Sequence, residues 1–240
     1  MMRQLQLWDG QGDEHGWSVR QSPRARRLSV RVFRHGGVEI VVPPRTSAAR
    51  VSAFVSEHRE WIERQRRRSA PSMQWPLPPS VLALSALEEE WPCVAGEPGG
   101  RMRIREQNGR LLLEGDLAER DRLRHALRRW LVGRALQRFE EPLATLAAHM
   151  GVVPERLQIR CQRTRWGSCS RRGTISLNAC LLFQRPDVLR YLMVHELSHL
   201  KHMNHSARFW AEVARHEPEW KALDRELLQG WRRVPSWIFK

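Results

Sequence analysis

Residues 195–205 read His195-Glu196-Leu197-Ser198-His199-Leu200-Lys201-His202-Met203-Asn204-His205. Two histidines four residues apart, with glutamate directly after the first, form the H-E-x-x-H pattern of helix-borne zinc sites. On a helix, positions i and i+4 lie above one another on one face, so both imidazoles can bind the same ion. Glu196 is offset by about 100°, which places its carboxylate beside the open position of the metal, where water binds. The pattern therefore predicts a metal-binding helix with Glu196 as the general base.

The residues before this motif are typical of a buried helix. Pro186 fits a first helical position, and Asp187 complements the positive helix start. Apolar side chains follow at Leu189, Leu192, Met193, Val194 and Leu197. No proline or glycine interrupts the motif, so a helix through His199 is the expected structure.

The third ligand has several candidates, of which His202 is the nearest in sequence. It lies three residues after His199 on the same helix face. Three ligands on one straight helix cannot surround an ion tetrahedrally, because His195 and His202 would be about 10 Å apart along the axis. We therefore expect a structural role for His202.

His205 becomes a ligand if the helix stops near Met203 and the chain turns back. Asn204 makes such a turn plausible, because asparagine tolerates the left-handed conformation that ends helices. A carboxylate from the following helix, Glu212 or Glu217, is the alternative third ligand. The residues favour His205 and leave the two glutamates open.

Length and patterning predict an α+β chain with two portions. Residues 1–115 form a β-rich N-terminal portion, with a hairpin at 17–42 around His35-Gly36-Gly37 and one helix at about 48–68. Short strands then recur between 81 and 115, with Asn108-Gly109 as a turn. A Pro-rich connector at 70–80 separates the two β regions.

Residues 116–240 are expected to form a minimal zincin-like metal-binding catalytic domain. A long helix at about 117–149, which Pro142 would break or kink, begins it. Strands at 156–161 and 174–178 follow, before the helix that carries the motif. Together, a long helix, a small sheet and a metal-bearing helix describe a minimal zincin domain.

The composition favours a cytoplasmic protein that attracts polyanions. The chain has no apolar run long enough to span a membrane, and its first ten residues lack the apolar stretch of a secretory signal. It carries 41 lysine and arginine residues against 26 aspartate and glutamate residues, for a formal net charge of +15. Only three of the basic residues are lysines. Such a charge predicts non-specific nucleic-acid binding at low salt, while the oligomeric state stays open.

Several segments resemble the YgjP-like metallopeptidases, which are relatives of the SprT and WLM zincin groups. The matching segments are Arg165-Trp166-Gly167-Ser168-Cys169, Ile175-Ser176-Leu177-Asn178, Tyr191, His195-Glu196-Leu197-Ser198-His199-Leu200 and Asn204-His205-Ser206-x-x-Phe209-Trp210. The close resemblance covers about residues 155–225. A weaker similarity extends toward the N-terminus through Arg26–Val32 and His58-x-x-Trp61-Ile62.

The resemblance implies zinc ligands at His195, His199 and His205, with Glu196 as general base. It also implies an intracellular prokaryotic protein. One zinc ion per chain, bound by three neutral imidazoles, would keep a fourth position for water, whose pKa falls to about 7.

The negative oxygen that develops during hydrolysis needs a further donor. Arg165 and Arg163, beside the Trp-Gly-Ser turn, are the candidates, and Arg165 is preferred. Tyr191 lies one turn before His195 and is expected to pack, while Ser168 is a weaker donor. The strand Ile175–Asn178, just before the metal helix, is either an edge strand that pairs with an extended peptide or an ordinary core strand.

These features predict a zinc-dependent hydrolase, most simply a metallopeptidase that acts on a peptide or protein. A metal-dependent phosphohydrolase of nucleotides is the alternative, because arginine suits bidentate phosphate contacts. A protease that processes DNA-associated proteins is a third hypothesis, consistent with the positive charge but without a recognisable binding motif.

Overall fold

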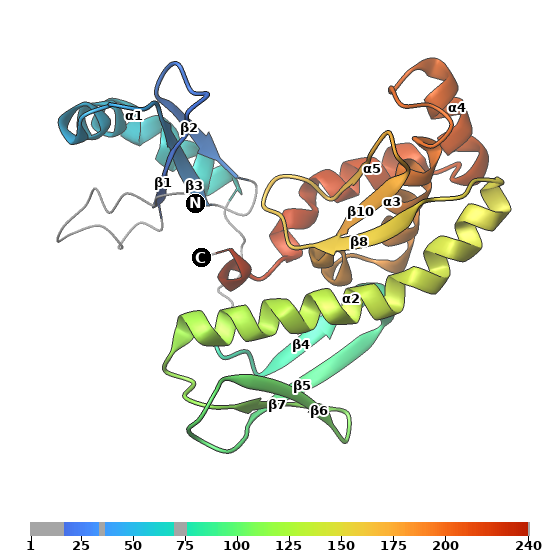
Figure 1. The fold of residues 1–240 in the computed structure, drawn as a ribbon, viewed down its shortest axis with the longest axis horizontal. Helices are drawn as coiled ribbons and strands as arrows, with labels where there is room; N and C mark the ends of the chain where they lie inside the picture. The colour runs from blue at the N-terminus through green and yellow to red at the C-terminus, as the bar shows by residue number, and fades with distance from the viewer. Residues whose placement is uncertain (1–16, 34–36, 70–75, 240) are drawn as a thin grey trace. The chain divides into compact units, whose positions relative to one another are not determined.

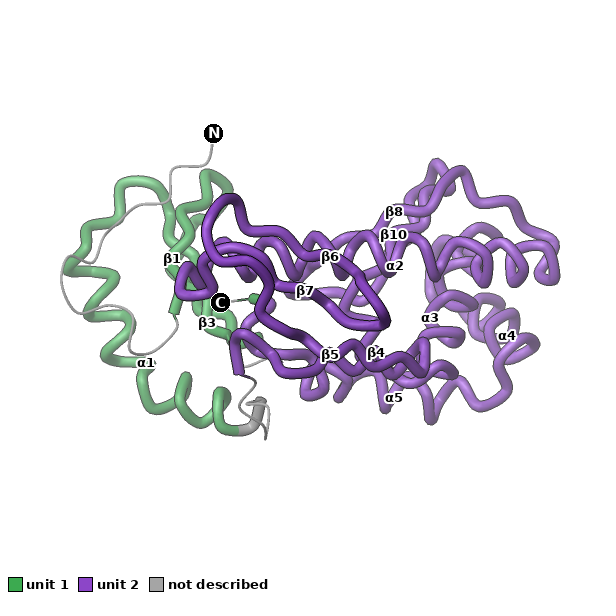
Figure 2. Tube along the Cα trace, turned by 90° about the horizontal axis from the view of Figure 1, so that it is seen from below, with its two compact units in different colours: residues 1–74, 239–240 green, residues 75–238 purple. Residues whose placement is uncertain are grey.

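The computed structural model describes residues 17–33, 37–69 and 76–239. The chain packs as two compact units, residues 1–74 with 239–240 and residues 75–238 (Figure 2). Within the described ranges, five α-helices accompany three sheets that mix parallel and antiparallel pairs (Figure 1). This arrangement confirms the α+β class. None of the described helices is both long and apolar enough to cross a membrane.

The first unit is a three-stranded sheet with one helix packed on it. Its elements are β1 (Trp17–Gln21), β2 (Ser29–Val32), β3 (Val38–Val42) and α1 (Ala48–Ser69). β3 lies in the centre, antiparallel to β2 and parallel to β1. The antiparallel pair is the predicted hairpin, whose tip at residues 34–36 lies outside the described residues. β1 was not expected as a third, parallel strand, because parallel pairing leaves no short-range turn signal.

The core of this unit forms between one face of the sheet and α1. Ile40 and Val42 of β3 pack with Val51 of α1, and all three are at most 2% exposed. Val19 and Val30 of the neighbouring strands cover the same cluster. Ile40 and Val42 point to the same face of β3, because side chains two residues apart share a face, and this face meets the helix.

The second unit begins with a four-stranded sheet in the order β4-β5-β7-β6. Its strands are β4 (Val81–Leu84), β5 (Glu89–Ala95), β6 (Arg103–Gln107) and β7 (Arg110–Glu114), with a 3-10 helix at Ser85–Leu87. Asn108 and Gly109 both have positive φ, 50° and 70°, as the predicted hairpin turn between β6 and β7 requires. Residues 76–80 form no element, and the rest of the Pro-rich connector, residues 70–75, lies outside the described chain.

The long helix α2 (Arg120–Met150) follows this sheet. Its buried residues recur at helical spacing along one face and are Leu123, Ala126, Leu127, Leu131, Ala135, Phe139, Leu143, Ala147 and Met150. The helix continues through Pro142, so the predicted break does not occur; Figure 1 shows one helix that bends toward its C-terminal end. Gly151 then ends it with a φ of 65° and an N–H that reaches the carbonyls of Ala147 and Ala148.

A second small sheet has the order β8-β10-β9. Its strands are β8 (Arg156–Arg160), β9 (Gly167–Cys169) and β10 (Thr174–Asn178). Of the two alternatives for Ile175–Asn178, the edge strand is wrong and the core strand is confirmed, because β10 pairs with β8 on one side and with β9 on the other. The edge strand of this sheet next to the motif helix is β9.

The helices of the C-terminal half complete this unit. They are α3 (Pro186–Ser198), α4 (Ala207–His216) and α5 (Trp220–Gln229), with 3-10 helices at Ala179–Phe183, Gly230–Arg233 and Ser236–Ile238. α3 packs against α2, α4, α5 and β9. This central place explains why α3 is apolar on nearly all sides.

The predicted division of the chain at residue 115 runs inside the second unit, between β7 and α2. The assignment of residues 116–240 as the catalytic domain stays a prediction.

Candidate metal centre

α3 carries the first two histidines of the candidate site. Pro186 occupies its first turn, as predicted, and the helix runs through Ser198. His199 is the C-cap residue but keeps helical dihedral angles, φ −66° and ψ −21°. The rings of His195 and His199 therefore stay on one helix face, with centroids 5.2 Å apart.

The chain reverses directly after α3 and returns a third histidine to the first two. The N–H groups of Lys201 and His202 both reach the carbonyl of Ser198, at 3.1 and 3.0 Å. These bonds form a last turn after α3, which ends at Ser198, five residues before the predicted stop near Met203. Asn204 has no positive φ, so the predicted left-handed turn at this residue is wrong.

An ion pair holds the returning loop against α4. The Nζ of Lys201 lies 2.6 Å from Oε1 of Glu212, whose other close partner is Nε2 of His216 at 3.2 Å. Beyond this tether, His205 approaches α3 until its Nε2 lies 3.2 Å from Nε2 of His195.

The structure brings His195, His199 and His205 together, with their nearest ligand atoms all within 4.8 Å of one another. Three converging imidazoles fit a zinc ion, which prefers nitrogen and sulfur ligands in tetrahedral geometry. The alternative third ligands lie elsewhere. Glu212 is engaged as described, and Glu217 pairs with Arg190.

The protonation of the histidines suits a cation. Burial and the neighbouring histidines lower the pKa of His195 to about 3, so its ring is neutral at physiological pH. Nδ1–H of His199 donates to the carbonyl of His202 at 3.1 Å, which leaves its Nε2 with a free lone pair. His202 thus contributes its backbone, consistent with the structural role expected for it.

Aromatic side chains of α4 form a floor under the histidines. The ring of Phe209, which is fully buried, lies 5.0, 4.5 and 4.7 Å from those of His195, His199 and His205. Trp210 stacks on the exposed His205, with centroids 5.6 Å apart and planes at 27°. The spacing of Phe209 and Trp210 after His205 was visible in the sequence, but nothing local revealed this contact.

Glu196 is a buried carboxyl group at the side of the histidine cluster. Its side chain is 4% exposed, and Oε2 has no hydrogen-bond partner among the described residues. Burial raises the pKa of Glu196 to about 8, although the positive charge of Arg165 partly offsets the rise. An unpaired carboxyl group in such a place is costly for stability, which points to a chemical role.

Gly167 allows β9 to lie directly against this carboxyl group. A Cβ atom at Gly167 would be 2.4 Å from Oε1 of Glu196 and 2.9 Å from its Cδ. The sequence contained Gly167 within the Trp-Gly-Ser turn, but its contact with Glu196 depends on tertiary packing.

The outer edge of β9 presents backbone groups beside Glu196. The N–H of Asn178 bonds to the carbonyl of Trp166 at 2.8 Å, and the N–H of Ser170 bonds to the carbonyl of Thr174 at 3.0 Å. In an antiparallel pair the bonded residues alternate, so Gly167 and Cys169 turn their N–H and C=O groups away from β10. No hydrogen bond from the described residues reaches those groups.

The loop before β9 carries Arg165 and is held by hydrogen bonds from a side chain of β10. The buried amide of Asn178 donates to the carbonyls of Gln162 and Arg165, at 2.9 and 2.8 Å. The next residue, Trp166, is buried and stacks on Trp231 with centroids 4.0 Å apart. The Arg165 side chain is exposed, and its charge acts on Glu196.

Tyr191 is buried, and its hydroxyl faces α5. Its hydroxyl donates to Oδ1 of Asp224 at 2.9 Å, and its side chain is 1% exposed. This agrees with the packing role expected for Tyr191 and removes it as an oxyanion donor.

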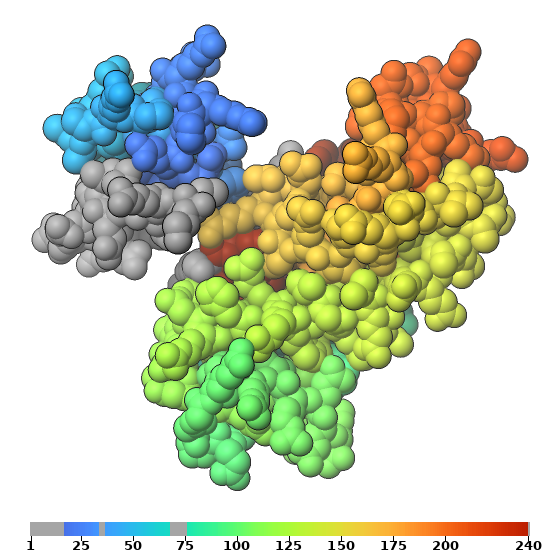
Figure 3. All heavy atoms as spheres, in the orientation of Figure 1, coloured from blue at the N-terminus to red at the C-terminus, as the bar shows by residue number. Residues whose placement is uncertain are grey.

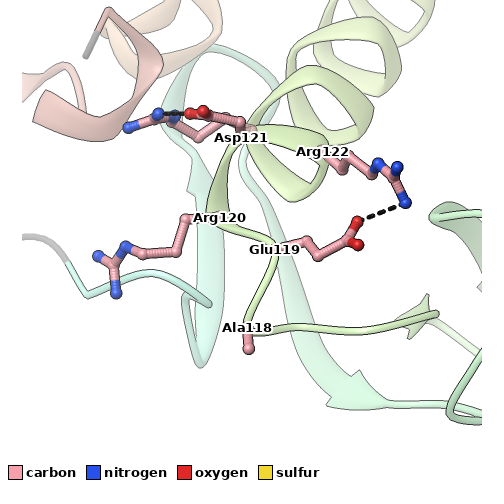
Figure 4. A pocket seen from close by; sticks show the side chains of 6 residues that line it. Ala118, Glu119, Arg120, Asp121 and Arg122 are labelled. Atoms are coloured by element: carbon pink, nitrogen blue, oxygen red, sulfur yellow. Dashed lines mark ion pairs between the residues drawn. The ribbon is translucent and has the colours of Figure 1, made fainter.

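A separate surface pocket of about 470 Å³ opens at the start of α2. Two ion pairs lie among its lining side chains, Arg122 with Glu119, drawn in Figure 4, and Arg124 with Asp121. None of its lining residues belongs to the elements that carry the histidines or Glu196. The pocket is therefore unrelated to the metal centre.

Known proteins similar to this chain are peptidases. The family described as YgjP-like, metallopeptidase domain, matches residues 26–229. Among solved structures, the metallopeptidase zymogen of Pyrococcus abyssi abylysin is 27% identical, with a TM-score of 0.36 over 40% of this chain and 97% of that one. The zymogen of Methanocaldococcus jannaschii jannalysin is 20% identical, with a TM-score of 0.34 over 38% and 93%. A search among curated proteins finds no match.

Gly167→Ala should disable the site while the fold persists. The added methyl group must displace either β9 or Glu196, and a misplacement of about 1 Å at a reacting group costs on the order of 10²-fold in rate. Hydrolysis of an unstructured protein and the thermal unfolding midpoint would be measured together. Gly133→Ala is the control, because nothing lies within 4 Å of a Cβ at Gly133. Full activity of Gly167→Ala would show that Glu196 does not depend on its contact with β9.

Proposed function

The chain belongs to the YgjP-like metallopeptidase family, and from this premise we propose that it hydrolyses peptide bonds with one zinc ion bound by His195, His199 and His205. The convergence of three imidazoles within 4.8 Å, beside a buried carboxyl group, is the observation that carries the proposal. The family supports a peptide or protein as the substrate. No contact among the described residues favours the nucleotide alternative.

A zinc ion at this site would act as a Lewis acid and lower the pKa of water at its open position to about 7. The three imidazoles would hold the ion as neutral ligands, which agrees with the lowered pKa of His195. The hydrogen bond from His199 to the carbonyl of His202 fixes the orientation of one ring. Trp210, stacked on His205, limits the rotation of another.

Glu196 is proposed to accept the proton of the attacking water and to pass it to the leaving amine. The pKa of about 8 for Glu196 reflects burial. A cation held by the neighbouring histidines favours the ionised form, so the carboxylate becomes available as a base when the site is loaded. Gly167 keeps Oε1 of this side chain against β9.

The substrate is proposed to lie along the outer edge of β9. Gly167 and Cys169 present unbonded N–H and C=O groups there, which an extended peptide can pair with. This replaces the segment Ile175–Asn178, whose strand is central. Pairing along Gly167 brings the peptide backbone beside Glu196, where the scissile bond must lie.

Arg165 is proposed to stabilise the negative oxygen that develops in the transition state. The support is its exposed side chain next to β9 and its electrostatic effect on Glu196. Asn178 anchors the backbone from which this side chain extends.

His205→Ala should lose zinc, whereas His202→Ala should keep it. Removing a residue that only orients a metal ligand through a hydrogen bond lowers metal affinity by about 10–100-fold. Removing a ligand itself should lower the zinc affinity further. His202→Ala is a matched control, because His202 uses its backbone carbonyl and not its ring. Zinc content after dialysis and affinity by chelator competition would be measured. Full zinc binding by His205→Ala would disprove the ligand set.

Glu196→Gln should keep zinc and lose turnover. The amide preserves size but cannot accept the proton, so kcat should fall on the order of 10²-fold or more. Cleavage of an unstructured protein, with and without chelator, would be compared with zinc content. Glu155→Gln, at an exposed position, serves as the control. If Glu196→Gln binds zinc and still cleaves at the parental rate, Glu196 is not the proton carrier.

Arg165→Lys should lower kcat at least about 10-fold and leave KM nearly unchanged. The planar guanidinium is matched to an oxyanion in the transition state, and an ammonium group keeps the charge without that geometry. Steady-state kinetics on a fluorogenic peptide would separate the two constants, with Arg171→Lys as an exposed control. A rise in KM at constant kcat would assign Arg165 to ground-state binding instead.

A further inference from the structure

One end of the sheet in the first unit gathers arginines that no described acidic residue neutralises. β1 and β3 are parallel and end side by side, with Gln21 opposite Val42. β2 is antiparallel to β3 and begins at this same end, with Ser29 opposite Val41. The loop 22–28 between β1 and β2 therefore crosses the end of β3, where the loop 43–47 departs toward α1.

Hydrogen bonds fix the crossing. The N–H of Ser22 donates to the carbonyl of Val42 at 2.9 Å, and the N–H of Ala25 donates to the carbonyl of Ser22 at 3.0 Å. The two loops are thereby held together at the sheet end. We call this end, with Arg24, Arg26, Arg27 and Arg45, the arginine end.

All four arginines are exposed, and no ion pair or hydrogen bond to a described residue involves their side chains. Neither loop contains an acidic residue. Between residues 17 and 56, the described chain has seven arginines and a single acidic residue, Glu39, which pairs with Arg20 at 3.2 Å. In Figure 3, side chains of the blue segment project from the surface of this unit.

The backbone at Arg45 adds a second observation. Its φ is 62°, in the left-handed region that glycine or asparagine adopts at lower cost. The turn nevertheless carries arginine, and strained residues of this kind concentrate at functional sites.

We infer that the arginine end is a binding surface for the phosphate backbone of nucleic acid. One guanidinium group can donate two parallel hydrogen bonds to the oxygens of a phosphate. The four arginines are spread over two loops, which suits a row of phosphates rather than one ion. A membrane surface fits less well, because the neighbouring exposed residues are prolines, serine and alanine rather than large apolar side chains that insert into lipid. The surface is independent of the histidine cluster, which lies in the other unit.

The salt dependence of binding to a short labelled DNA duplex tests the inference in the full chain. Four phosphate contacts give a slope of about −4 for log affinity against log salt, or roughly a 10²-fold loss between 50 and 200 mM. Replacement of the four arginines, in R24Q/R26Q/R27Q/R45Q, should weaken binding at low salt by at least about 10²-fold and remove most of the slope. Fluorescence anisotropy measures both.

The control is R101Q/R103Q/R110Q/R120Q, which removes the same charge from exposed positions of the second unit. It should change the affinity by no more than a few-fold. Circular dichroism and retained peptide hydrolysis would confirm that both variants fold. If both variants weakened DNA binding equally, the effect would come from net charge alone and the inference would be overturned. The inference would also be overturned if R24Q/R26Q/R27Q/R45Q bound DNA with the parental affinity. The same holds if this variant lost binding to phosphatidylserine vesicles but kept its binding to DNA.

Discussion

The position at which α3 ends governs whether three imidazoles can meet. A straight helix supplies two ligands at i and i+4, and each further residue moves along the axis by about 1.5 Å. Because His199 keeps helical dihedral angles at the C-cap, its ring stays in register with that of His195, and the chain turns back over the residues that follow. The Lys201–Glu212 pair then fixes the returning loop on α4, and His205 reaches the first two rings. Had the chain kept a helical path through His205, the rise along the axis would have carried that ring away from the other two.

The packing that orders the histidines also isolates Glu196 from water. Phe209 of α4 stacks on the ring of His199. β9 approaches Glu196 so closely that only glycine fits at residue 167. A carboxyl group in this environment holds its proton unless a positive charge is near, which is why its pKa rises to about 8. A cation at the histidines and the ionisation of Glu196 therefore favour one another.

Local patterns in the sequence predicted much of this structure. Periodicity and turn residues, which act over a few positions, predict the helix that carries the motif and its proline start. They also predict the hairpin at Asn108-Gly109 and the helix at about 48–68. Contacts between distant segments were not predictable in the same way. The central place of β10 depends on pairing with both β8 and β9, and the passage of α2 through Pro142 depends on a buried face that continues on either side. The end of α3 carries no glycine or proline signal, so the sequence placed it too late.

The charge of +15 is distributed unevenly, and this matters more than its size. Arg134 of the second unit serves packing, because it is only 13% exposed, binds Glu89 at 2.7 Å and lies over the ring of Trp91. Its charge is neutralised within the fold and offers little to a polyanion. The loops at the arginine end have no acidic partner, so their charge is available to solvent and ligands. Arginine content alone therefore says little about binding. A guanidinium group held in a largely buried ion pair offers less charge to a ligand than the exposed guanidinium groups that the sheet topology gathers on two adjoining loops at the arginine end.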